Sequence, residues 1–163
     1  MTTIKFSSLT LLALLLALAL ITDSDGYIFI IDDANLAFHE AGHIFFGLFG
    51  NTVSLYGGTL GQLVFPIVTA IVFFRQGAMA SCAVSLLWFF ENFFNIARYM
   101  ADARTQILPL VGGGDHDWTN IFSRWGLLGH DVTISNITRI LGWLGIILTI
   151  FFVFHQWNQA RKA

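Results

Sequence analysis

Residues Asn35–Gly50 read NLAFHEAGHIFFGLFG, an apolar stretch that contains His39, Glu40 and His43. Residues four apart lie on the same face of an α-helix, so both imidazoles can reach a single metal ion. Glu40 then stands beside that ion as a general base for water. This is the HExxH pattern, in which two histidines bind zinc and the glutamate activates water. The stretch therefore predicts a helix that carries a catalytic Zn²⁺ site.

The surroundings of this motif strengthen the prediction. Three ionisable residues fall within five positions of an apolar segment, and such groups are costly to bury without a partner. Ionisable residues inside a membrane segment usually serve a function. The structural alternative is a pair of hydrogen-bonded core histidines with the glutamate paired nearby. We favour the metal site over this alternative.

The composition is that of an integral membrane protein. Of the 163 residues, 56% are hydrophobic, 15% are aromatic and only 11% are charged, whereas a soluble domain has roughly 25% charged residues. The net charge of −2 and the lack of a basic patch exclude nucleic acid as a partner and leave the lipid bilayer as the expected one. Because no internal repeat or composition shift is visible, residues 1–163 are expected to form a single membrane-embedded domain.

About five apolar segments predict an all-α, polytopic membrane helix bundle, in which each helix crosses the ~30 Å hydrocarbon layer. They run from Ile4 to Ile21, Tyr27 to Gly50, Leu60 to Phe74, Ala78 to Ala101 and Ile134 to Trp157. An odd number of crossings puts the two termini on opposite sides of the membrane. The first segment is alternatively a signal peptide, but its best cleavage match, Ala17-Leu18-Ala19, lies inside the apolar run. We therefore expect a retained helix and a multi-pass protein.

Two polar stripes predict a wet cavity between helices. Asp32, Asn35, His39 and His43 follow one helical face of the second segment. Asn92, Asn95, Tyr99 and Asp102 follow one face of the fourth segment in the same way. Metal-bound imidazoles need a partner on their other ring nitrogen, and Asp32 or Asn35 could orient His39 in this way.

The sequence leaves the third metal ligand open. Residues 103–130 are the only long polar stretch, and Gly112–Gly114 allow its backbone to fold back toward the membrane with Asp115, His116 and Asp117. The alternative is a solvated loop at the membrane surface, anchored by its tryptophans.

At HEAGH, the sequence resembles the site-2 protease family of intramembrane zinc metalloproteases. The resemblance implies that His39 and His43 bind zinc, that Glu40 activates water, and that a later aspartate completes the metal site. Asp102 is the positional analogue of that aspartate, although it lacks the surrounding NxxP…LDG pattern of the family. Asp102 also ends a helix of about 24 residues, or ~36 Å, and would lie beyond a mid-membrane metal. His116 is the chemical alternative, and we slightly favour it.

The predicted function is that of a zinc-dependent peptidase that cuts a peptide or a membrane-protein substrate within or beside the bilayer. One alternative is a membrane hydrolase acting on a lipid amide. Another is a metal-dependent oxidase, which would need further ligands, such as those offered by Asp102, His116, His130 and Glu91. The third is a non-catalytic subunit that keeps a metal only for structure, or none.

Overall fold

The computed structural model describes residues 3–22, 28–111 and 115–162, and the regular structure in these ranges is entirely helical. The elements are α1 (Thr3–Thr22), α2 (Phe29–Gly47), α3 (Asn51–Arg75), α4 (Met79–Ala101), α5 (Asp117–Trp125), the 3₁₀ turn η1 (Leu128–His130) and α6 (Asp131–Lys162). The prediction of an all-α helical bundle is thus confirmed. The predicted hinge, Gly112–Gly114, lies outside the described residues.

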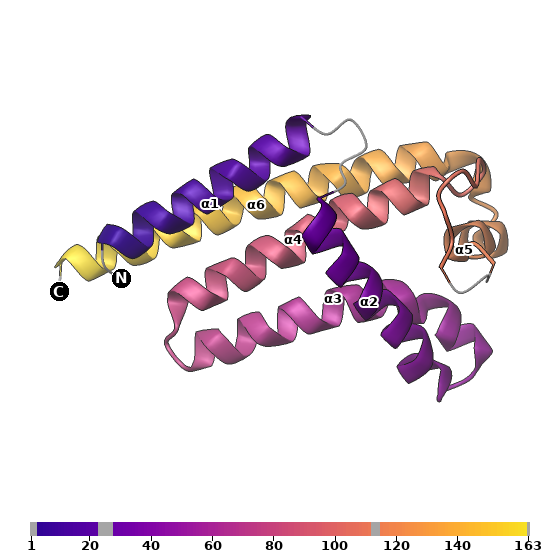
Figure 1. Ribbon diagram of the computed structural model, residues 1–163, viewed down its shortest axis with the longest axis horizontal. Helices are drawn as coiled ribbons and strands as arrows, with labels where there is room; N and C mark the ends of the chain where they lie inside the picture. Colours follow the sequence, from indigo (N-terminus) through magenta and orange to yellow (C-terminus); the bar gives the residue numbers. More distant parts are fainter. Residues whose placement is uncertain (1–2, 23–27, 112–114, 163) are drawn as a thin grey trace.

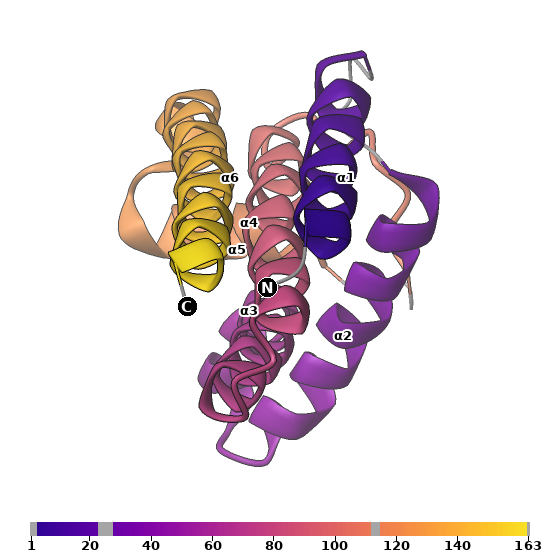
Figure 2. The ribbon, with the colours of Figure 1, turned by 90° about the vertical axis from the view of Figure 1, so that its left-hand side faces the viewer.

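The bundle is built on two antiparallel pairs that share α4. A short turn joins α3 to α4, and α6 runs back along α4 (Figure 1). Helix α1 lies against both α6 and α4, and α2 packs obliquely on α3 (Figure 2). The short α5 lies at the end of the bundle where α4 ends and α6 begins.

Glycines allow α2 and α3 to touch through their backbones. A Cβ placed on Gly42 would lie 2.1 Å from the carbonyl oxygen of Gly57. A Cβ on Gly61 would lie 2.4 Å from the carbonyl oxygen of Phe38. Any larger residue would therefore force the helices apart, as in the small-residue contacts that bring membrane helices together. This close approach sets the distance between the histidines of α2 and the residues of α3.

Helices α4 and α6 are held together by aromatic rings that fit against glycines. A Cβ on Gly145 would lie 1.9 Å from Cδ1 of Phe90, and one on Gly142 would lie 2.6 Å from Cε2 of Phe94. The hydroxyl of Ser135 also donates a hydrogen bond of 2.7 Å to a backbone carbonyl of α4. These contacts fix α4, which in turn carries several residues of the candidate site.

Helix α5 is amphipathic and packs by its apolar face on the end of the bundle. Its first turn is capped by His116, whose Nδ1 accepts a hydrogen bond from the backbone N–H of Thr119 at 3.2 Å. Gly126 ends the helix with a φ of 68°, a left-handed conformation that favours glycine. The buried side chains of Trp118, Ile121 and Phe122 join Ile96, Met100 and Ala103 in one apolar cluster. The start of α5 is thereby positioned beside α4.

Three helical stretches of the described chain are long and apolar enough to cross a membrane. They are α3, α4 and the stretch Leu128–Lys162, whereas the apolar part of α1 is shorter, at Phe6–Ile21. Apolar side chains also cover the outside of the bundle, with Leu14, Val68, Leu148 and Phe151 between 49% and 64% exposed. Such a surface suits a lipid environment better than water. Five helices match the predicted apolar segments, but by length and composition α2 is not among the spanning candidates.

The two ends of the chain lie at the same end of the bundle, so the predicted placement on opposite sides is wrong. The rings of Phe6 and Trp157 are stacked with their centroids 4.4 Å apart. Opposite faces of a hydrocarbon layer would separate them by ~30 Å. The reason lies in α2, which runs obliquely over α3 instead of traversing the bundle from end to end (Figure 1).

We predict that Gly61→Ala destabilises the protein, because its new methyl group would meet the backbone of α2. Overpacking of this kind costs about 1–3 kcal/mol, which should appear as a lower melting temperature of the purified protein in detergent. Gly129→Ala is the matched control, since a Cβ there meets nothing within 4 Å. Equal melting temperatures for the two variants would contradict the backbone contact between α2 and α3.

Candidate metal centre

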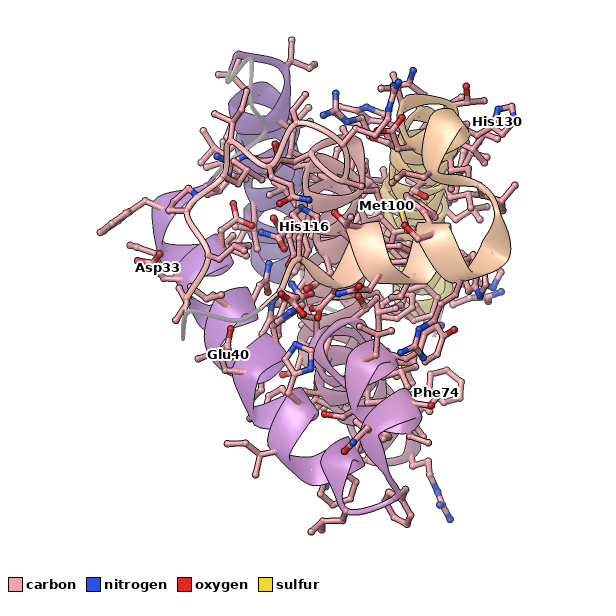
Figure 3. All side chains as sticks on the ribbon, turned by 90° about the vertical axis from the view of Figure 1, so that its right-hand side faces the viewer. Asp33, Glu40, Phe74, Met100, His116 and His130 are labelled. Atoms are coloured by element: carbon pink, nitrogen blue, oxygen red, sulfur yellow. The ribbon has the colours of Figure 1, made fainter. Side chains whose placement is uncertain are left out.

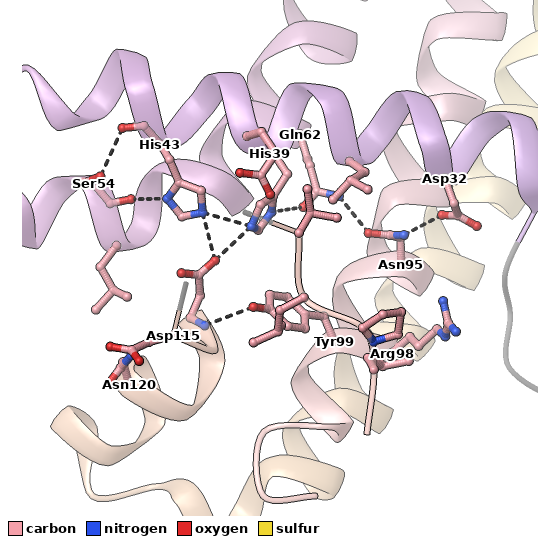
Figure 4. A pocket seen from close by; sticks show the side chains of 18 of the residues that line it. Asp32, His39, His43, Ser54, Gln62, Asn95, Arg98, Tyr99, Asp115 and Asn120 are labelled. Carbon is pink, nitrogen blue, oxygen red and sulfur yellow. Dashed lines mark hydrogen bonds and ion pairs between the residues drawn. The ribbon is translucent and has the colours of Figure 1, made fainter. Parts of the chain in front are cut away.

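Three side chains converge on one point beside α2. Nε2 of His39 lies 3.0 Å from Nε2 of His43, and Oδ2 of Asp117 lies 2.9 Å from the first and 3.0 Å from the second. Figure 4 shows the imidazoles of His39 and His43 side by side, joined by a dashed line. Among the described residues, His39, His43 and Asp117 are the one group of three or more histidines, cysteines or carboxylates arranged to hold a metal ion.

The other nitrogen of each imidazole faces an oxygen atom. Nδ1 of His39 lies 3.0 Å from Oε1 of Gln62, and Nδ1 of His43 lies 2.8 Å from the backbone carbonyl oxygen of Ser54. A carbonyl oxygen can only accept, so each Nδ1 carries a proton, and Nε2 of each ring is the atom left to face Asp117 or a metal ion. This is the arrangement that orients metal-binding histidines and fixes their tautomer.

The three atoms are close enough to share a proton or a metal ion. Two imidazole lone pairs and a carboxylate oxygen within about 3 Å of one another repel unless a proton or a metal ion lies between them. Around a tetrahedral zinc with bonds of about 2.0–2.1 Å, neighbouring ligand atoms would lie about 3.3 Å apart. The spacing of the three atoms therefore fits zinc after shifts of a few tenths of an ångström.

Gly58 leaves the space that an ion would occupy. A Cβ on this residue of α3 would lie 2.4 Å from Nε2 of His39 and 2.6 Å from Nε2 of His43. Any side chain at position 58 would thus stand where the two ligand atoms converge. Together with the donor set, this cradle shows that the residues fit a bound metal ion.

Asp117 reaches the site because it is the first residue of α5. Its backbone N–H donates a hydrogen bond of 3.1 Å to the hydroxyl of Tyr99, which ties the start of α5 to α4. Burial alone would raise the pKa of the Asp117 carboxyl, but its hydrogen bonds with His39 and His43 outweigh that effect and lower the pKa. The carboxylate form, which is the form that binds metal, is favoured.

The structure corrects the two predicted candidates for the third ligand. Asp102 and His116 both lie outside the group, and they face each other, with Nε2 of His116 3.5 Å from Oδ2 of Asp102. Asp102 accepts hydrogen bonds from the hydroxyl of Thr105 and from the backbone N–H groups of Ile107 and Leu108. It therefore shapes the chain that follows α4, and both of its oxygens already accept hydrogen bonds there.

His116 is similarly committed to a structural role. Its Nδ1 caps α5, and its ring packs on Tyr99 at a centroid distance of 4.1 Å. Burial lowers its pKa, although the neighbouring Asp102 and Asp117 act in the opposite direction. The loop thus folds back toward the candidate metal site, as the sequence predicted. The residue that it presents there is Asp117, which follows His116. The position of Asp117 in the first turn of a helix was the signal that could have distinguished the two.

Other predicted candidates lie elsewhere. His130 is exposed, on the opposite side of this end of the molecule from Glu40 (Figure 3). Glu91 is fully buried and accepts a hydrogen bond of 2.8 Å from Nδ2 of Asn35. The second group of ligands that a two-metal oxidase would need is therefore not assembled from the described residues.

Glu40 and the metal ligands line a common cavity of about 780 Å³. The cavity extends along α2 from Asn51 and Ser54, past the metal ligands, to Asp32 and Arg98 (Figure 4). The chain that follows α4 contributes the apolar wall at Leu108, Pro109, Leu110 and Val111. A cavity lined by polar residues of α2 and α4 is thus present, and Glu40 lines it together with the two histidines.

No protein-family model, curated protein or solved structure matches this chain. The candidate site is therefore judged on its geometry and its donor atoms.

We predict that the purified protein binds about one zinc ion per chain and that His39→Ala, His43→Ala and Asp117→Ala each abolish this binding. Removal of any ligand leaves two protein donors, too few for a stable site. Metal content measured by inductively coupled plasma mass spectrometry checks the prediction. Asp102→Asn and His116→Asn are the controls, and both should retain the metal. Loss of zinc from the controls, with retention in Asp117→Ala, would show that the third ligand is assigned incorrectly.

A second prediction concerns the cradle at Gly58. Gly58→Ala should weaken zinc binding at least about tenfold, because its methyl group displaces the imidazoles from their shared focus. The dissociation constant is measured by competition with a chromophoric chelator. Gly47→Ala, on the same face of contact between α2 and α3, adds a methyl group 3.4 Å from Oγ of Ser54 and should bind zinc normally. Unchanged affinity in Gly58→Ala would place the metal somewhere else.

Proposed function

We propose that this protein is a multi-pass membrane zinc metallopeptidase. The observation that carries the proposal is the convergence of Nε2 of His39, Nε2 of His43 and Oδ2 of Asp117 beside a cavity that Glu40 also lines. Three protein ligands leave one coordination position open, which distinguishes catalytic zinc sites from structural ones. The glutamate next to the first histidine supplies the general base.

The proposed reaction is the hydrolysis of a peptide bond. Zinc held by the three ligands would lower the pKa of a water molecule to about 7 and polarise the scissile carbonyl. Glu40 accepts a proton from that water as the water oxygen bonds to the carbonyl carbon. When the C–N bond breaks, Glu40 returns the proton to the amine nitrogen that leaves. Gln62 and the carbonyl of Ser54 keep the imidazoles in the tautomer that this chemistry requires.

The cavity suits a segment of polypeptide as the substrate. Its volume of about 780 Å³ is within the range of roughly 300–1,000 Å³ typical of ligand pockets. Apolar residues from three elements, among them Leu36, Leu55 and Leu110, line it together with the polar residues near the metal. The apolar exterior and the spanning helices support a location in the membrane. A membrane-protein segment, or a peptide beside the bilayer, is therefore the substrate we propose.

The single group of metal ligands favours a hydrolase over the oxidase alternative, which would use two metal ions. A purely structural metal site would be closed by a fourth protein ligand. In this structure the described histidine, cysteine and carboxylate ligands number three, and they face a cavity. These two features support catalysis over a structural role.

We predict that Glu40→Gln keeps zinc bound but lowers turnover by about 10²–10⁴-fold, the usual contribution of a general acid–base group. The assay incubates the zinc-loaded protein in lipid nanodiscs with a library of single-span membrane peptides and identifies fragments by mass spectrometry. Chelation should stop cleavage, and added zinc should restore it. Intact peptides after incubation with zinc-loaded wild-type protein, or equal cleavage by Glu40→Gln, would overturn the proposed function.

A further inference from the structure

A chain of side-chain hydrogen bonds leads away from the candidate metal ligand His39 through two amides to a buried carboxylate. Oε1 of Gln62 lies 3.0 Å from Nδ1 of His39, and Nε2 of Gln62 donates to Oδ1 of Asn95 at 2.7 Å. Nδ2 of Asn95 then donates to Oδ1 of Asp32 at 2.6 Å (Figure 4). The chain passes from α2 to α3, on to α4, and back to α2 about two helical turns before His39.

The Asp32 carboxylate at the far end determines which group donates and which accepts in each of these side-chain hydrogen bonds. A carboxylate only accepts hydrogen bonds, whereas each amide has one accepting oxygen and one donating nitrogen. Asp32 therefore turns the NH₂ group of Asn95 toward itself, which leaves the oxygen of Asn95 for Gln62. Gln62 in turn must present its own oxygen to the imidazole. The proton of His39 is consequently held on Nδ1, and the lone pair on Nε2 faces Asp117.

Asp32 is itself held in place as an acceptor. It is 1% exposed, and the backbone N–H of Ile28 donates to its Oδ2. Nδ2 of Asn35 lies 3.4 Å from its Oδ1. The orientation of Asn35 is unambiguous, because the indole N–H of Trp88, which can only donate, bonds to Oδ1 of Asn35 at 2.8 Å. Ile28, Asn35 and Asn95 thus each present an N–H group to Asp32, and the carboxyl group of Glu91 lies beside it.

We call the hydrogen-bonded series Asp32, Asn95, Gln62 and His39 the relay. Because its members are buried, the relay determines which nitrogen of His39 carries the proton. Gln62 is 3% exposed and His39 is 7% exposed, so water has little access to replace a lost partner. His43 needs no such relay, since the backbone carbonyl of Ser54 can only accept its Nδ1 proton. The two ligands of α2 therefore have different sources of orientation, one in the backbone and one in a distant carboxylate.

We infer that Asp32 is a positioning residue for metal binding: through Asn95 and Gln62, its carboxylate fixes the tautomer of His39. The sequence predicted that Asp32 or Asn35 could orient this histidine directly, and the structure shows an indirect route instead. The inference rests on the metal site of the proposed function, but it requires no peptidase activity. Replacement of this acceptor by an amide allows Asn95 and Gln62 to turn over, which places a donor against Nδ1 and favours the proton on Nε2.

The test is a cycle of variants in which the polarity of the relay is reversed. Asp32→Asn removes the carboxylate from the far end, and Gln62→Glu places one directly against His39. In the double variant, the new amide at position 32 donates to Asn95, Asn95 donates to the new carboxylate at position 62, and that carboxylate accepts the proton of His39. Every group is again paired, with the same total charge as in the wild type.

The affinity for Zn²⁺ is measured for all four proteins by competition with a chromophoric chelator. Asp32→Asn should weaken binding about 10–100-fold when residue 62 is glutamine, the usual cost of losing an outer-shell partner. The same substitution should strengthen binding when residue 62 is glutamate, because it removes a conflict of Asn95 with two carboxylates. Asp102→Asn, a carboxylate-to-amide change at a residue whose hydrogen bonds go to Thr105, Ile107 and Leu108, should bind zinc as the wild type does.

We expect Asp32→Asn to weaken zinc binding when residue 62 is glutamine and to strengthen it when residue 62 is glutamate. General destabilisation by Asp32→Asn cannot produce these opposite effects. Weakening by the same factor in both backgrounds, or unchanged affinity in Asp32→Asn, would overturn the relay. If zinc does not bind to the wild type, the metal site itself fails. If zinc binds and follows the predicted cycle without any peptide cleavage, the relay stands and only the proposed peptidase activity fails.

Discussion

The backbone contact between α2 and α3 is the constraint on which the candidate site depends. Gly42 and Gly57 bring the two helices so close that a methyl group on either would meet the other's carbonyl oxygen. At this separation the imidazole of His43 reaches the carbonyl of Ser54, and that of His39 reaches Gln62. Gly58, one position along α3, leaves open the point where the imidazoles converge. The same run of small residues therefore brings the helices together, orients the ligands and leaves room for the ion.

Electrostatics explains why this arrangement could hold a cation. Hydrogen bonds at both Nδ1 atoms direct two lone pairs and the carboxylate of Asp117 into one partly buried space. Mutual repulsion of these acceptors opposes the fold until a proton or a metal ion joins them. A metal ion bound by this group would link α5, which carries Asp117, to α2, which carries the histidines.

Local patterns in the sequence were enough to predict the five long helices, the pairing of His39 with His43 and the polar face of α4, but not the short α5. Each of these follows from the 3.6-residue period within one segment. The third ligand depended on how the chain folds between α4 and α5, where adjacent residues point in different directions. A shift of one residue exchanges His116, which caps α5, for Asp117, which faces the metal. No periodicity within a loop contains that information.

The placement of the two chain ends was mispredicted for a related reason. Composition marks a segment as apolar, but it does not say whether the helix traverses the bundle or lies obliquely across a neighbour. The oblique path of α2 follows from its glycine contact with α3, which is a property of the pair. A helix laid across the bundle can present His39, Glu40 and His43 to a cavity bounded by α4 and α5. The oblique course of α2 thus makes the membrane crossings hard to count. The same course lets the polar residues of α2 share one cavity.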